Sequence, residues 1–166
     1  MKKLFLLLVL VATAYTQISF AQIVPKHPED TTNQAQLSQL LNYYYQIKDA
    51  LISGDPNTAA IQAEAFLKTA NGISNRTISE GSRNALVKDA GVISESNDLK
   101  KQREVFANLS TNMYAFASSL KSTSEPIYYQ YCPMKKAYWL SADQAIKNPY
   151  YGSAMLTCGK VVDTLN

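Results

Sequence analysis

Histidine, cysteine, glycine and proline are all scarce in this sequence. Its 166 residues include one His, two Cys, six Gly and six Pro. A single histidine excludes every zinc-finger, haem or blue-copper site that needs two His ligands. The low Gly and Pro content, together with 46% hydrophobic residues, excludes low-complexity and disordered chains. The composition therefore predicts one ordinary globular domain, whose chemistry, if any, is that of sulfur.

Charge is absent from a long stretch near the N-terminus. Lys2 and Lys3 precede an apolar run over residues 4–14, and small residues stand first and last in Ser19-Phe20-Ala21. This pattern predicts a signal peptide over residues 1–21 and an exported protein, periplasmic or secreted. An uncleaved membrane anchor is the alternative, but polar residues interrupt the apolar run well before the roughly 20 residues that a span requires. We expect no stable membrane anchor after cleavage.

Neither sign of charge dominates the expected mature chain. The whole sequence has 16 basic and 13 acidic residues, and removal of residues 1–21 takes away two lysines and no acid. The remaining net charge of +1 argues against a nucleic-acid partner. Residues 22–32 are polar and contain Pro25, His27 and Pro28, so we expect a flexible leader there. In that leader His27 is either a solvated residue or a ligand that folds back onto a metal site.

Residues 33–166 are predicted to form a single domain that begins with four helices. Apolar residues recur at steps of three and four from Asn33 to the stop at Gly54, and again between Asp55-Pro56 and Gly72. A weaker third pattern covers residues 78–93, and a fourth runs from an expected cap at Asp98 to Leu120. These patterns predict a mainly α fold, an up-and-down four-helix bundle.

The C-terminal residues 126–166 have a different pattern. Pro126 ends the helical periodicity, and residues 127–131 alternate as a strand does. Further short strands are plausible at residues 137–141 and 161–165. We therefore predict a small irregular or β appendage, rich in sulfur and aromatic residues, that packs on the helices.

Four of the five sulfur residues after residue 21 fall within the last 35 residues: Cys132, Met134, Met155 and Cys158. Pro133 prevents helix, so in an extended chain the side chains of Cys132 and Met134 would share one face. Met155 and Cys158 stand three apart, as on one face of a helical turn ended by Gly159. Convergence of the two pairs would create a soft-ligand site for copper(I) or silver(I).

Aromatic residues surround these sulfurs in the sequence. Trp139, Tyr131 and Tyr138 could shield a bound ion from water, although such residues are more often ordinary packing. The cysteines alone also allow a structural disulfide between Cys132 and Cys158. It would close a loop of 27 residues and stabilise the fold by about 3 to 4 kcal/mol. The residues by themselves favour neither the metal site nor the disulfide, and the two could alternate as oxidation states of one site.

The amino-acid sequence of residues 126–166 resembles that of a known family in four segments. The segments are Tyr131-Cys132-Pro133-Met134, Ala137-Tyr138-Trp139-Leu140-Ser141, Asn148-Pro149-Tyr150-Tyr151-Gly152 and Met155-Leu156-Thr157-Cys158-Gly159. They are similar to an uncharacterised family of exported bacterial proteins, many from Bacteroidetes. The same domain of unknown function is found as a C-terminal extension of periplasmic adaptor proteins of copper/silver efflux pumps.

The resemblance implies a helical bundle with a heavy-metal-binding tail, in which Cys132, Met134, Met155 and Cys158 are the ligands. It also implies an efflux adaptor or another periplasmic protein as partner. One departure is that only Lys135-Lys136 stand where the family often has a longer polar insert.

No catalytic constellation is present, because the lone His27 leaves no base for a nucleophile and no phosphate-binding glycine loop occurs. We therefore expect no enzyme. The expected function is periplasmic binding of copper(I) or silver(I) for sequestration or delivery to heavy-metal efflux. The alternative is a disulfide-stapled protein-interaction module without metal.

Overall fold

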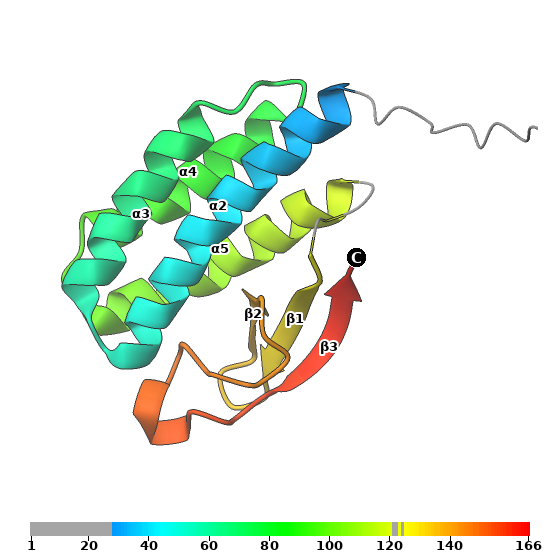
Figure 1. Cartoon of the computed structure of the whole chain (residues 1–166). Coiled ribbons are helices and arrows are strands. Elements are labelled where there is room, and N and C mark those ends of the chain that lie inside the picture. The colour runs from blue at the N-terminus through cyan, green and yellow to red at the C-terminus, as the bar shows by residue number, and fades with distance from the viewer. Residues whose placement is uncertain (1–27, 121–122, 124) are drawn as a thin grey trace, which may run out of the picture.

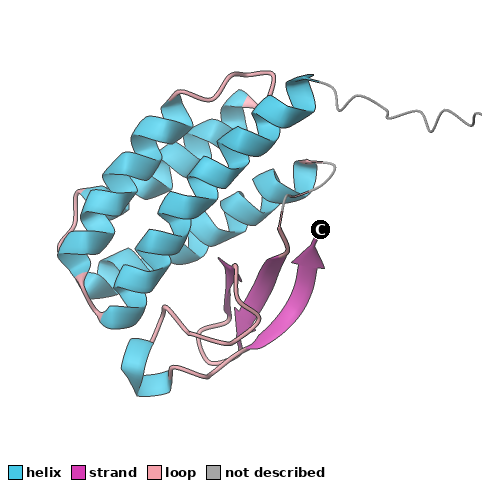
Figure 2. Ribbon diagram, in the orientation of Figure 1, coloured by secondary structure: helices cyan, strands magenta, loops and turns pink. Residues whose placement is uncertain are grey.

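The described part of the chain folds into four α-helices followed by a small sheet (Figures 1 and 2). The computed structural model describes residues 28–120, 123 and 125–166. The helices are α2 (Pro28–Ser53), α3 (Pro56–Asn71), α4 (Glu80–Ser94) and α5 (Leu99–Ser119). The strands are β1 (Ile127–Cys132), β2 (Ala137–Ser141) and β3 (Lys160–Leu165), and the short 3-10 helix η1 (Gly152–Met155) precedes β3. The prediction of a mainly helical protein with a β tail is confirmed.

Helix α2 starts earlier than the sequence pattern indicated. It begins at Pro28, not at Asn33, so the last five residues of the expected leader are helical. Proline is well accommodated in the first turn of a helix, where its missing N–H has no intrahelical partner to lose. The rest of that leader, His27 included, lies outside the described residues, as does the expected signal peptide. In the described part of the chain, no helix is both long and apolar enough to span a membrane.

Helix α3 begins as its local sequence predicts. The Asp55 side chain accepts a hydrogen bond from the backbone N–H of Thr58 at 3.0 Å, and Pro56 occupies the first helical position. The carboxylate thereby satisfies one of the N–H groups that a helix start leaves without a partner.

The core lies between consecutive helices, which pack against one another along the chain. The apolar stripes predicted for α2 and α5 are buried, and Met113 of α5 is fully enclosed. The buried stripe residues of these two helices are Leu37, Leu40, Leu41, Tyr44, Ile47, Leu51, Phe106, Leu109, Met113 and Phe116.

The three strands form an antiparallel sheet in the order β2-β1-β3, packed beside α5 through β2 (Figure 1). Strand β1 is central and pairs with β2 from Tyr128 opposite Ser141 to Cys132 opposite Ala137. On its other edge β1 pairs with β3, where Tyr131 lies opposite Lys160.

A buried tyrosine connects the helices to the sheet. The hydroxyl of Tyr44 in α2 is hydrogen-bonded to the Ser110 hydroxyl of α5 at 2.7 Å. The same oxygen accepts the backbone N–H of Leu140 in β2 at 3.0 Å. The Tyr44 ring also stacks on Phe106 with centroids 5.0 Å apart. One side chain thus joins the first helix, the last helix and the sheet.

Replacing Tyr44 with phenylalanine is expected to reduce the free energy of unfolding by about 1 to 3 kcal/mol. The ring packing remains, but the Leu140 N–H and the Ser110 hydroxyl lose their buried partner. Urea denaturation followed by circular dichroism measures the change. Tyr43→Phe is the control, because Tyr43 is half-buried in the same helix and its ring packs beside the core. Equal stability of the two variants would show that the Tyr44 hydroxyl contributes nothing.

Candidate metal centre

The two cysteines meet because of the sheet register. Cys132 ends β1, and Cys158 stands two residues before β3. Since Tyr131 pairs with Lys160 in an antiparallel ladder, continuing that ladder places residues 132–133 opposite 158–159. The Sγ atoms of the two cysteines are 3.7 Å apart, and both thiols are free. The expected convergence of the two cysteines is therefore present in the structure.

A tight turn directs two backbone N–H groups at the sulfurs. Residues 133–136 connect β1 to β2, and the N–H of Lys136 donates to the carbonyl of Cys132 at 2.8 Å. Within this turn the N–H of Lys135 donates to Cys132 Sγ at 3.4 Å. The backbone N–H of Met134 approaches Cys158 and acts to lower the pKa of its thiol.

The same turn separates the side chains of Cys132 and Met134. The expectation that an extended chain would direct both to one face is wrong, because the chain reverses after Cys132. Cys132 is fully buried, whereas Met134 is 63% exposed. The Met134 side chain therefore stands on the outside of the turn, in contact with solvent.

Met155 lies next to Cys158, but not in one regular helix with it. Met155 is the last residue of η1, and the N–H of Cys158 donates to its carbonyl at 3.0 Å. Its side chain is 36% exposed and that of Cys158 is half-buried. The backbones of both methionines thus contact Cys158, and both flexible thioether side chains are partly accessible.

Asn148 holds the loop that carries Cys158. This buried residue donates its side-chain amide to the carbonyl of Cys158 at 2.7 Å and its N–H to the carbonyl of Leu156 at 2.8 Å. Its side-chain oxygen accepts the N–H of Tyr150 at 2.8 Å. By its sequence, Asn148-Pro149 is typical of a turn. An asparagine can organise a loop through both ends of its amide, but nothing in the sequence shows which carbonyl it will meet.

Gly159 allows the cysteine loop to approach the sheet closely. A β-carbon at this position would lie 2.7 Å from Cη2 of Trp139 and 3.0 Å from the carbonyl oxygen of Tyr131. Its φ of +154° is also one that residues with side chains rarely adopt. The residue next to Cys158 therefore packs directly on the buried indole.

The aromatic residues expected around the site divide between the two faces of the sheet. Trp139 pairs with Gln130 and shares the face of Cys132, because paired residues and alternate residues of a strand point the same way. Tyr131 pairs with Tyr138 on the opposite face, and their rings lie 4.6 Å apart. Trp139 is fully buried, and Tyr150 packs edge-on against it at 6.0 Å. Trp139 and Tyr150 are thus the aromatic residues on the cysteine side.

Proximity of the two thiols affects the protonation of Cys158. Burial raises the pKa of the Cys158 thiol, and the hydrogen bond and the charge of Cys132 raise it further, while the Met134 N–H acts in the opposite direction. Binding of a soft cation to both sulfurs would displace the protons of the two thiols, and its positive charge would offset the repulsion between the resulting thiolates.

Ligands other than sulfur are scarce around the pair. In the part of the chain that the structure describes, no group of three or more His, Cys, Asp or Glu side chains could hold a metal ion. Any ion at the cysteines would therefore rely on the thioethers of Met134 and Met155, or on a ligand from outside.

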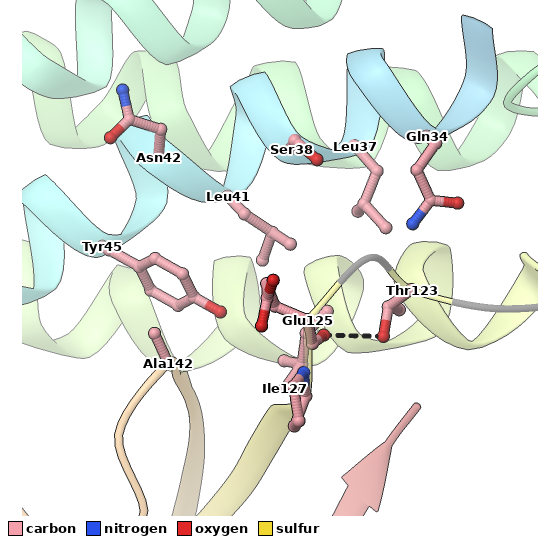
Figure 3. A pocket seen from close by; sticks show the side chains of 11 residues that line it. Gln34, Leu37, Ser38, Leu41, Asn42, Tyr45, Thr123, Glu125, Ile127 and Ala142 are labelled. Atoms are coloured by element: carbon pink, nitrogen blue, oxygen red, sulfur yellow. Dashed lines mark hydrogen bonds between the residues drawn. The ribbon is translucent and has the colours of Figure 1, made fainter. Parts of the chain in front are cut away.

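A groove lies in another part of the molecule, away from the sulfur residues. It has a volume of about 240 Å³ between α2 on one side and Thr123 and residues 125–127 on the other, and the ring of Tyr45 and the side chain of Leu41 point into it (Figure 3). Thr123 closes one end through a 2.8 Å hydrogen bond from its hydroxyl to the carbonyl of Glu125. The groove contains no sulfur and is separate from the cysteine pair.

The fold and the site define a small, mainly helical protein whose C-terminal antiparallel sheet carries a pair of free cysteines. A family model described as "Protein of unknown function (DUF3347)" matches residues 40–125, which is more than half of the chain. The chain belongs to this family of unknown function. No curated protein and no solved structure matches it.

Proposed function

We propose that this protein binds a soft monovalent metal ion, copper(I) or silver(I), through Cys132 and Cys158, with Met134 and Met155 as further ligands. The observation that carries the proposal is the 3.7 Å separation of two free thiols, with the backbones of both methionines in contact with Cys158. Thiolate and thioether sulfur are the ligand types that favour copper(I) in proteins.

The distance between the sulfurs suits an ion with more than two ligands. With a metal–thiolate length of about 2.3 Å, as for zinc, a 3.7 Å separation corresponds to a sulfur–metal–sulfur angle of about 107°. Two-coordinate ions prefer a straight arrangement, so an ion at the observed spacing would need additional donors. The exposed thioethers of Met134 and Met155 are the nearest candidates in sequence and in backbone position.

Partial exposure of the sulfurs favours transfer of the ion over permanent storage. Cys132 is enclosed, but Cys158 and both methionines are open to solvent to some degree. A partner's ligand could therefore attack the ion from the methionine side while the buried thiol still holds it. We accordingly infer a role in sequestration and delivery to heavy-metal efflux, in an exported protein whose four helices form an up-and-down bundle.

The test is an anaerobic titration of the reduced protein with copper(I) against a competing chelator. We expect one ion per chain, and loss of binding in the double variant Cys132→Ser, Cys158→Ser. The double variant Met134→Leu, Met155→Leu should bind about 10- to 100-fold more weakly, because two neutral donors are lost while both thiolates remain.

Met113→Leu serves as the matched control, because Met113 is a core residue of α5 far in sequence from the sulfur pair. It should bind as the unaltered protein does. If the methionine pair can be replaced without effect and the purified protein has no free thiol, the disulfide-stapled interaction module becomes the better account of the tail.

A further inference from the structure

A cationic groove lies beside the turn that carries Met134. Its volume is about 410 Å³, and it runs between the first turns of α5 and the turn after β1. Lys100 and Arg103 line it from α5, and Lys135 lines it from the turn. Glu104 is the one carboxylate among its lining residues. The groove therefore has an excess of positive charge, although the whole protein is only weakly basic.

The cations of the groove have no ionic partner within the described residues. The ion pairs of the described residues join Lys48 to Asp49 and Lys68 to Glu64, and none of these four residues lines the groove. Arg103 donates one hydrogen bond, from Nη2 to the carbonyl of Leu51 at 2.7 Å, and its Nε is buried without a partner. Burial without a counter-charge lowers the pKa of Arg103. A guanidinium held in this way gains from a carboxylate that approaches it.

Backbone surrounds one nitrogen of the Arg103 guanidinium. Its Nη2 donates to the carbonyl of Leu51 at 2.7 Å and would lie 2.8 Å from a β-carbon on Gly152. Arg103 is thus a positioned cation, whereas Lys100 is exposed at the rim.

The remaining walls of the groove are apolar or aromatic. Tyr150 and Tyr151 form one wall and Leu99 contributes to the other. Tyr150 is buried, and Tyr151 and Leu99 pack on the core while remaining partly exposed. Such walls favour a ligand with apolar side chains in addition to negative charge.

We propose that this groove binds an acidic segment of a partner protein in which carboxylate and apolar side chains alternate. Charge complementarity with Lys100, Arg103 and Lys135 selects the acidic side chains, and the tyrosine wall accepts the apolar ones. Binding there needs no metal, so the inference does not rest on the function proposed above. Because Lys135 follows Met134 directly, a segment bound in the groove would lie next to the exposed thioether.

The test uses a labelled peptide of alternating glutamate and leucine, and its fluorescence anisotropy at low ionic strength. To separate docking from metal binding, the receptor is the metal-free full chain with Cys132→Ser and Cys158→Ser. We expect saturable binding that weakens as salt is raised. A peptide with glutamine in place of glutamate should bind at least about tenfold more weakly.

Charge reversal locates the binding site. Lys100→Glu with Lys135→Glu, added to the same receptor, should weaken peptide binding at least about tenfold. Lys101→Glu with Lys88→Glu changes the net charge equally but alters exposed lysines outside the groove, so binding should stay within about twofold. Circular dichroism checks that both variants are folded. Equal losses in the two pairs, equal binding of the glutamine peptide, or no saturable binding would overturn the proposal.

Discussion

Gly159→Ala is expected to destabilise the protein by about 3 kcal/mol or more. The added β-carbon would meet the Trp139 ring at 2.7 Å and the Tyr131 carbonyl at 3.0 Å, and neither group can move freely. Trp139 is fully buried, and the Tyr131 carbonyl belongs to the central strand. Overpacking of a core costs about 1 to 3 kcal/mol, and an unfavourable backbone conformation costs a similar amount. Urea unfolding monitored by tryptophan fluorescence reports both stability and the surroundings of Trp139.

Gly81→Ala is the matched control for this experiment. Gly81 is in the first turn of α4, and a β-carbon there would meet nothing within 4 Å. In a helix alanine is preferred to glycine by up to about 1 kcal/mol, so the control should be as stable as the original protein or more so. Unfolding of the two alanine variants at the same urea concentration would show that the close approach at Gly159 does not require glycine.

Oxidation of the cysteine pair is expected to abolish copper(I) binding. The two sulfurs must approach from 3.7 Å to the bonding distance of about 2.0 Å, which rotation of the partly exposed Cys158 side chain can provide. Oxidised glutathione would accept the two electrons and two protons and leave as two molecules of reduced glutathione. The product retains the thioethers but has lost both thiolates. Thiol counting confirms the reaction, and the chelator competition then measures the affinity.

Stability provides an independent measure of the same reaction. Closure of the 27-residue loop should raise the free energy of unfolding by about 3 to 4 kcal/mol. Cys132→Ser is the control, because it retains Cys158 but cannot form the intramolecular bond. Copper(I) binding of undiminished affinity by the fully oxidised protein would show that the thiols are not ligands.

Much of the fold could be predicted because its signals are local. Asp55 and Pro56 define the start of α3 within two residues, and the alternating pattern after Pro126 predicts β1. Helix α2 begins five residues before its predicted start, because proline breaks a helix interior but is favourable in the first turn. Local patterns predict the elements better than their ends.

The geometry of the sulfur residues depends on long-range contacts that no local pattern contains. Pairing of β1 with β3 determines that Cys132 and Cys158 meet, and that register includes an irregularity at Tyr129 and Gln130. The chain turns after Cys132 where the sequence predicts extended chain, because proline is compatible with both conformations. Whether Tyr131 faces the cysteines depends in turn on strand pairing, which placed it on the other face of the sheet.

The Tyr44 hydroxyl, which is hydrogen-bonded to both α5 and β2, makes the helices depend on the sheet. The family match ends at residue 125, before the first strand, yet Tyr44 and Phe106 within the match rest on Leu140 and Tyr150 beyond it. A fragment that ended at residue 125 would expose these aromatic rings to water and would therefore be prone to aggregation. Recombination that transplants the helices into another protein must therefore carry the sheet along with them.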